Sequence, residues 1–272
     1  MIVVEGASPA ACTELAQRLA VQCEAAGDAV VLPMRGMRGH PLRRAFASDA
    51  YDSVDAFIET LVLQWHNFAI RAAAAEDLWI CANVWLEAPR ALLDEGRLTP
   101  DGAIAFATRL FDALAPLSPT LLYLSAAPGD GLGDGAFAGL EVHRTLLNSD
   151  RLHAAEQAGE ALAFLGRPRR EIVLDPGLAA RLAGRYRVSE HSVLELAAAE
   201  GGLRVTGPEA ALGADPRPVL PTPDGRLLVA GADLELRARL DDAGRSTGLL
   251  ARTSDPALDV LPEFLPRDAE LP

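Results

Sequence analysis

Residues 1–13 read MIVVEGASPAACT, and this stretch decides the fold of the first part of the chain. Ile2, Val3 and Val4 predict a buried strand over residues 2–5, and Gly6 marks the turn after it. An apolar-periodic helix is expected over residues 11–26. In that helix Leu15, Leu19 and Cys23 recur every four residues and share one face. A strand followed at once by a helix predicts one unit of a layered α/β domain.

The same alternation continues to about residue 165. Further strands are expected over residues 29–33, 78–85 and 120–125, and a long helix over residues 54–75. Thr99 followed by Pro100 is typical of a helix start, so another helix is expected over residues 100–115. Residues 35–52 show no regular period. Strands that alternate with helices predict a parallel sheet covered on both faces.

The pattern of apolar residues changes near residue 170, from helical spacing to alternation. Residues 234–240 read LELRARL, which places Leu234, Leu236, Ala238 and Leu240 on one face of a strand. Turn signals fall at residues 200–202, 223–225 and 242–245, and we expect about six strands between residues 182 and 253. The prediction is an antiparallel curled sheet or small open barrel. The expected boundaries are an α/β domain over 1–168, a β module over 176–255 and a C-terminal tail over 256–272.

Composition limits the partners. The 272 residues include 25 Arg and no Lys, a usage typical of a GC-rich bacterial genome, and the net charge is −13. An acidic chain repels nucleic acid and anionic membrane surfaces, so neither is expected as a partner. Cys12, Cys23 and Cys81 form no closely spaced pair, so we expect no disulfide and no metal site. Reduced thiols and the absence of a signal-peptide pattern predict a cytoplasmic protein.

The opening stretch also fits the frame of the phosphate-binding motif G-x-x-x-x-G-K-[ST]. Gly6 keeps the first glycine and Thr13 keeps the residue that would contact Mg²⁺. Ala11 replaces the second glycine, and Cys12 replaces the lysine that reaches the phosphates. The chain therefore has the frame of this loop without its cation.

On these residues the first part of the chain resembles the thymidylate-kinase-like branch of the P-loop nucleoside kinases. VEGASPAACTELAQRL fills the frame of a motif close to VEGxPGxGKST followed by LxxxL. Residues 80–89, ICANVWLEAP, resemble a weaker motif of the same group, with Ala82 at the position of an acidic residue. Residues 182–186 and the turns after them are similar to small β-rich modules appended to hydrolases and some P-loop proteins.

The resemblance implies a three-layer kinase-like domain that has lost its chemistry. Loss of a charge-neutralising group costs phosphoryl transfer on the order of 10³-fold, so we predict that the chain is not an ATP-dependent phosphotransferase. The leading hypothesis is that its groove binds a small, anionic molecule, in a non-kinase enzyme or accessory protein of bacterial specialised metabolism. A pseudokinase scaffold for a protein partner and a lysine-independent nucleotide kinase are the alternatives. No cofactor is expected, and the oligomeric state, homo-oligomer included, stays open.

The candidate site residues fall into two groups. The catalytic candidates each have a simpler alternative: Cys12 as a small apolar core residue, His66 as a core histidine, and Glu87 as an exposed helix acid. The ligand-binding candidates comprise an anion cradle after the first strand, a basic loop that follows the second strand, and tryptophans that a pocket or the core would hold. They are Gly6, Ser8, Thr13, Arg35, Arg38, Arg43, Arg44, Trp65 and Trp85.

Overall fold

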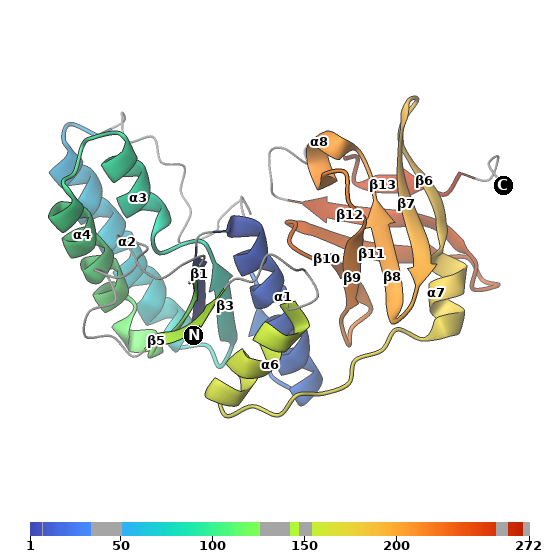
Figure 1. Cartoon of the computed structure of the whole chain (residues 1–272), viewed down its shortest axis with the longest axis horizontal. Helices are drawn as coiled ribbons and strands as arrows, with labels where there is room; N and C mark the ends of the chain where they lie inside the picture. Colours follow the sequence, from blue (N-terminus) through green and yellow to red (C-terminus); the bar gives the residue numbers. More distant parts are fainter. Residues whose placement is uncertain (7, 34–50, 126–141, 147–153, 254–260, 269–272) are drawn as a thin grey trace. The chain divides into compact units, whose positions relative to one another are not determined.

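The computed structural model describes residues 1–6, 8–33, 51–125, 142–146, 154–253 and 261–268. The chain divides into two compact units, one formed mainly by residues 1–168 and the other mainly by residues 169–272 (Figure 1). The first unit is the predicted α/β domain, and the second is an antiparallel β structure. Within the described residues no helix is long and apolar enough to cross a membrane.

The sheet of the first unit has the strand order β2-β3-β1-β4-β5, and its pairs are parallel. The central strand β1 is buried along its whole length, because it is covered by neighbours on both edges and helices on both faces. This explains why its sequence is a continuous apolar run with a single acid. The strands are β1 (Ile2–Gly6), β2 (Val30–Val31), β3 (Leu78–Ala82), β4 (Thr120–Ser125) and β5 (Val142–Leu146).

Helices cover both faces of this sheet, with α1 and α6 on one side and α2, α3 and α4 on the other (Figure 1). Two of the predicted helix starts are confirmed by their caps: Ser53 accepts a hydrogen bond from the Ala56 amide, and Thr99 accepts one from the Gly102 amide. The elements are α1 (Pro9–Ala26), α2 (Val54–Ala73), α3 (Glu87–Asp94), α4 (Pro100–Ala113), the short 3₁₀ helix η2 (Ala115–Leu117) and α6 (Ala154–Phe164). The apolar sides of α2, α3 and α4 form one core with the sheet.

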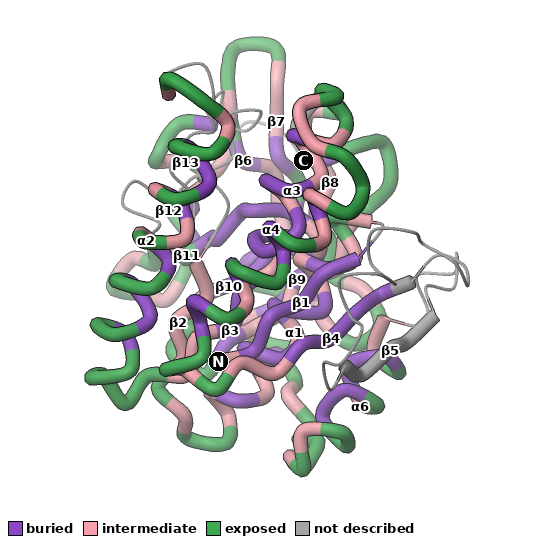
Figure 2. Tube along the Cα trace, turned by 90° about the vertical axis from the view of Figure 1, so that its left-hand side faces the viewer, coloured by how far each residue is buried: buried purple, intermediate pink, exposed green. Residues whose placement is uncertain are grey.

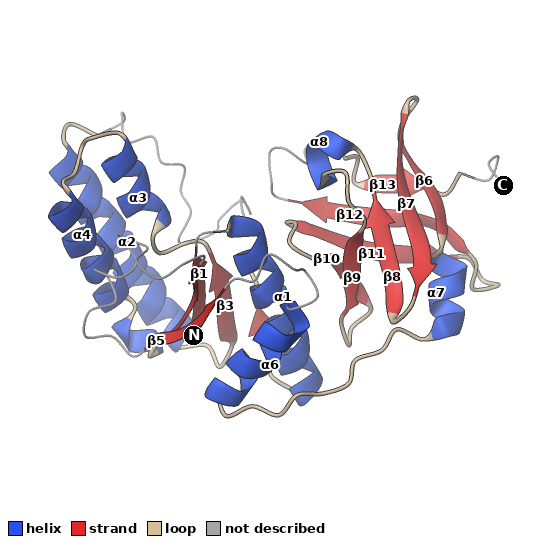
Figure 3. Cartoon of the chain, in the orientation of Figure 1, coloured by secondary structure: helices blue, strands red, loops and turns tan. Residues whose placement is uncertain are grey.

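The second unit is an eight-stranded antiparallel meander in which each strand pairs with the next along the chain (Figure 3). It has seven strands up to Thr253, one more than the sequence predicts, and an eighth beyond residue 255 in the segment expected to be a tail. The strands are β6 (Gly184–Ser189), β7 (Ser192–Ala199), β8 (Gly202–Thr206), β9 (Arg217–Pro221), β10 (Arg226–Val229), β11 (Leu234–Leu240), β12 (Ser246–Thr253) and β13 (Phe264–Pro266). Two short helices, α7 (Pro176–Leu182) and α8 (Glu209–Leu212), accompany them.

The sheet nearly closes on itself where β6 meets the end of the chain. Tyr186 and Arg267 form an isolated antiparallel bridge, and the Asp268 amide donates a hydrogen bond to the Arg185 carbonyl at 2.8 Å. The Arg267 guanidinium donates to the carbonyls of Arg181 at 2.9 Å and Ala183 at 2.6 Å. The expected small open barrel is therefore an eight-stranded barrel with one short seam.

Apolar side chains of the strands form the buried core of this unit, and Figure 2 shows the buried stretches of the chain in purple. Leu234 and Leu236 of β11 are fully buried, as their alternation predicts. Leu240, expected on the same face, is 42 % exposed. A register shift between Arg239 and Leu240 explains the difference, because an irregularity turns the residues after it away from the regular alternation.

Candidate functional site

Residues 9–13, which lie within the frame of the phosphate-binding motif, belong to α1. β1 ends at Gly6 and α1 already begins at Pro9, with Ser8 before it. The Ser8 hydroxyl accepts a hydrogen bond from the Ala11 amide at 3.4 Å, and the Ser8 carbonyl accepts one from the Cys12 amide at 3.0 Å. Positions 11–13, where the motif would turn around a phosphate, are therefore part of a regular helix. The Cys12 amide is used by the helix and cannot serve an anion.

Gly6 and Cys12 pack against each other and against β4. A Cβ atom added to Gly6 would lie 2.4 Å from the Leu124 carbonyl oxygen and 3.1 Å from the Cys12 sulfur. The glycine is therefore required by close packing of two strands and a helix, which accounts for it without any ligand. Cys12 has no exposed surface, and its burial, followed by the nearby charge of Glu5, raises the pKa of its thiol well above the usual value. Its place in the structure is that of a small apolar core residue.

Glu5 is a buried acidic residue that was not among the site residues predicted from the sequence. Its side chain is buried at the carboxyl end of β1, where one carboxylate oxygen, Oε1, accepts hydrogen bonds from the backbone amides of Val84 at 2.7 Å and Trp85 at 2.5 Å. Burial raises the pKa of Glu5 to about 7, while these amides and the positive charge of Arg90 act in the opposite direction. A carboxyl group with this pKa exchanges its proton near neutral pH.

Asn83 closes the same corner from the end of β3. Its backbone adopts φ 54°, a left-handed conformation that asparagine tolerates better than most residues. Its amide donates to the Val4 carbonyl at 3.0 Å, and its side-chain Nδ2 donates to the Pro9 carbonyl at 2.9 Å and to the Thr13 hydroxyl at 3.4 Å. Asn83 thus fastens the loop after β3 to the start of α1.

We call Glu5, Thr13 and Asn83 the carboxyl-end cluster. It lies where the connections from the adjacent strands β1 and β3 leave the sheet, the edge at which open α/β sheets usually bind ligands. In this chain the polar groups of the cluster are directed to backbone amides, to a carbonyl and to one another. The cluster holds two loops in place. Its one carboxyl group, that of Glu5, could take part in proton transfer, but it is buried.

The other predicted residues do not join this cluster. Trp65 and Trp85 are 1 % and 0 % exposed in the core of the first unit, and the Trp85 indole nitrogen donates to the Ala107 carbonyl at 2.6 Å. His66 is exposed on α2, and Glu87 is half-buried in the first turn of α3. Arg35, Arg38, Arg43 and Arg44 lie outside the described residues, so the basic loop stays a prediction.

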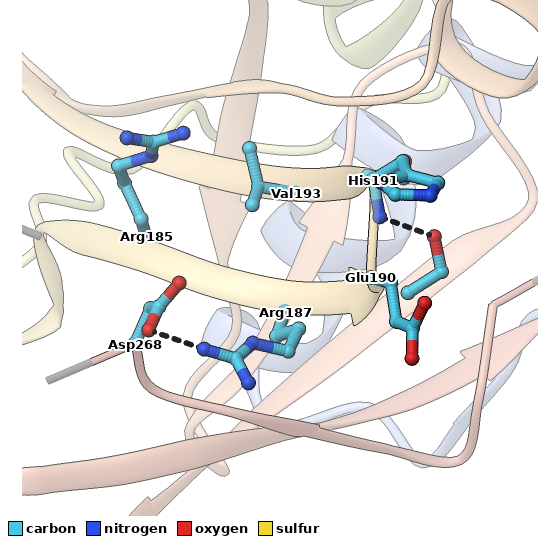
Figure 4. A pocket seen from close by; sticks show the side chains of 8 residues that line it. Arg185, Arg187, Glu190, His191, Val193 and Asp268 are labelled. Atoms are coloured by element: carbon cyan, nitrogen blue, oxygen red, sulfur yellow. Dashed lines mark hydrogen bonds and ion pairs between the residues drawn. The ribbon is translucent and has the colours of Figure 1, made fainter. Parts of the chain in front are cut away.

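A cavity is present in the second unit, on the outer side of the β6–β7 hairpin (Figure 4). Its volume is about 510 Å³, within the range of small-molecule sites. Its lining comprises two arginines, a histidine, two serines, two acids and one valine: Arg185, Arg187, His191, Ser189, Ser192, Glu190, Asp268 and Val193. Sequence reasoning missed it, although two arginines two residues apart on a strand next to a turn were a usable signal. Among the described residues no group of His, Cys, Asp and Glu could hold a metal ion.

Comparisons with known proteins assign no family. No family model matches the chain. No curated protein matches it either.

Proposed function

We propose that the protein is a binding protein built on a kinase-like α/β unit that does not transfer phosphoryl groups. The observation that carries this proposal is the start of α1 at Pro9. It puts the position of the missing lysine, Cys12, inside the helix with a fully buried side chain. In this reading the resemblance to P-loop nucleoside kinases reflects a retained frame, and the frame now serves as a scaffold.

Two further features support a role without ATP. Ala82, at the position where the resemblance implies a metal-holding acid, carries only a methyl group at the end of β3. Glu5, which follows the register partner of Ala82 on β1, is engaged by two backbone amides and is 2 % exposed. Neither residue offers a carboxylate to a Mg²⁺ ion, and phosphoryl transfer depends on that ion and on charge neutralisation.

The test is calorimetric titration of the full chain with Mg·ATP. We expect no binding tighter than about 1 mM and a negligible rise in melting temperature, because stabilisation by a ligand scales with its concentration relative to Kd. The variant Ala11→Gly with Cys12→Lys is expected to bind ATP no better, because the helix already occupies the place of the loop. Micromolar affinity for Mg·ATP, or ATP hydrolysis by purified protein, would contradict the proposal.

A second candidate, a scaffold that associates through protein contacts, is favoured by the outer face of α2. Leu63 and Ile70, two turns apart on this helix, are 59 % and 52 % exposed. The simplest partner is a second copy of the chain. Sedimentation at increasing concentration tests this, with Leu63→Ser and Ile70→Ser combined as the variant and Val173→Ser, another exposed apolar residue, as the control. Association that the double variant weakens and the control leaves intact would support the scaffold.

A further inference from the structure

The cavity on the β6–β7 hairpin is a polar site with one cation available. Seven of its eight lining residues carry a charge, an imidazole or a hydroxyl group, and Val193 is the exception. Most small-molecule pockets are predominantly apolar. A cavity of about 510 Å³ with this lining is suited to a small ligand that is itself polar over most of its surface.

The two arginines of the cavity differ in their partners. Arg187 donates to an oxygen of Asp268 at 2.8 Å, and the Asp268 side chain is only 6 % exposed (Figure 4). This pair is held in place because the Asp268 backbone amide is bound at the barrel seam by the Arg185 carbonyl. The charge of Arg187 is therefore already balanced inside the structure, and this arginine forms one wall of the site.

Arg185 has no such partner within the described part of the chain. Its Nε atom is buried and has no hydrogen-bond acceptor. A buried donor of a charged group without an acceptor costs free energy. Glu195 lies directly opposite on β7, but no ion pair between the two side chains is formed, and Glu195 does not line the cavity. An oxyanion that entered the cavity could accept hydrogen bonds from the rest of the Arg185 guanidinium group, which lines it.

The charge balance limits the ligand. Arg185 and Arg187 are matched by Glu190 and Asp268, so the lining has no excess positive charge to stabilise a dianion. A planar carboxylate can accept two parallel hydrogen bonds from a guanidinium group. The Ser189 and Ser192 hydroxyls, the His191 imidazole and the Glu190 carboxylate can exchange hydrogen bonds with hydroxyl groups of the same ligand.

From this arrangement we infer that the cavity binds a small hydroxylated monocarboxylic acid, with Arg185 as the group that receives the carboxylate. The inference deepens the proposed function by naming the ligand class, and it rests on that proposal only for the expectation that the protein acts by binding. The site lies wholly within the second unit. It would therefore stand even if the first unit were found to bind ATP.

The experiment is calorimetric titration of the full chain with gluconate, a hydroxylated monoanion. We expect a Kd below about 1 mM, and no binding of glucose, which has similar size and hydroxyl groups but no carboxylate. Arg185→Gln is expected to weaken gluconate binding about tenfold or more, since it removes charge-assisted hydrogen bonds. Arg185→Lys keeps the charge but loses the two parallel donors of the guanidinium group. We expect its affinity for gluconate to lie between those of the wild type and Arg185→Gln.

The control variant is Arg204→Gln, an exposed arginine on β8 that does not line the cavity. Circular dichroism and a thermal melt establish that each variant keeps the barrel. Wild-type affinity for gluconate in folded Arg185→Gln would overturn the role of Arg185. Absence of gluconate binding up to about 10 mM, or tighter binding of inorganic phosphate than of gluconate, would overturn the ligand class.

Discussion

At the residue scale, the buried carboxyl group of Glu5 links stability to pH. Its pKa is raised from 4.5 to about 7 in the folded chain, so between these values the folded state holds a proton that the unfolded state has lost. The free energy of unfolding therefore decreases as pH rises from about 4.5 through 7. The full effect, on the order of 3 kcal/mol, is reached above pH 7.

Glu5→Gln keeps an oxygen for the Val84 and Trp85 amides and removes the ionisation. We expect the variant to lose most of the decline in unfolding free energy between pH 5 and 8 that the wild type shows, as measured by urea unfolding at a series of pH values. The matched control is Glu76→Gln, which changes an exposed acid of the same unit. Parallel pH profiles for wild type and Glu5→Gln would show that this carboxyl group does not titrate as described.

Cys12 gives the second residue-scale prediction. Cys12→Lys places an ammonium group where the side chain has no exposed surface, and we expect it to lower the free energy of unfolding by about 3 kcal/mol or more. Ala10→Lys, two residues earlier on the exposed side of α1, should stay within about 0.5 kcal/mol of the wild type. Thermal and urea melts measure both. Equal stability of the two variants would mean that position 12 reaches solvent, as a phosphate-binding lysine must.

At the element scale, the Arg267 side chain joins the barrel seam to the end of α7. Arg267 donates to two carbonyls at the end of α7, those of Arg181 and Ala183, and its backbone pairs with Tyr186. Arg267→Ala leaves both carbonyls without this donor and should cost about 1.5–3 kcal/mol. Arg252→Ala, an exposed arginine on β12, is the control. Hydrogen exchange should quicken first in β6 and β13, and uniform exchange across all eight strands would contradict a local seam.

The elements also show what the sequence could and could not predict. The starts of α2 and α4 follow from local signals such as Thr99 before Pro100, and the sequence predicts both correctly. The helix α7, which Asp175 caps, was expected to be part of a linker, and β3 ends at Ala82, three residues before the expected end. The helix α1 begins at Pro9, two residues before the predicted start, and Ser8 followed by Pro9 is the local signal for this start. The strand Phe264–Pro266 is short and is held by pairing with β12 and by the seam, so local periodicity does not reveal it.

The candidate sites were harder to predict, because each depends on residues that are distant in sequence. Glu5 is bound by amides of residues 84 and 85, which reach it only when β3 pairs with β1. In the same way Asp268 meets Arg187 only when the end of the chain closes the barrel. Trp65 and Trp85 were considered as pocket residues or core residues, and only the packing of α2 and α4 against the sheet places them in the core.

At the scale of the whole molecule, the second unit has what an independent domain needs. Its buried apolar residues form a core of their own, and barrel closure leaves few unpaired strand edges. A unit of about 100 residues is small, but many single domains of this size fold alone. We therefore expect a fragment of residues 169–272 to fold alone, with a β-type circular dichroism spectrum and one cooperative thermal transition.

A shorter fragment, residues 169–255, makes this expectation specific. It keeps seven strands and lacks β13 and Arg267, so β12 and β6 become open edges and the end of α7 loses its donor. We expect this fragment to melt without a cooperative transition and to bind a dye for exposed apolar surface. If both fragments melt cooperatively with the same midpoint, the seam contributes nothing to the fold. If neither does, the second unit needs the rest of the chain, and the β6–β7 cavity can be studied only in the full protein.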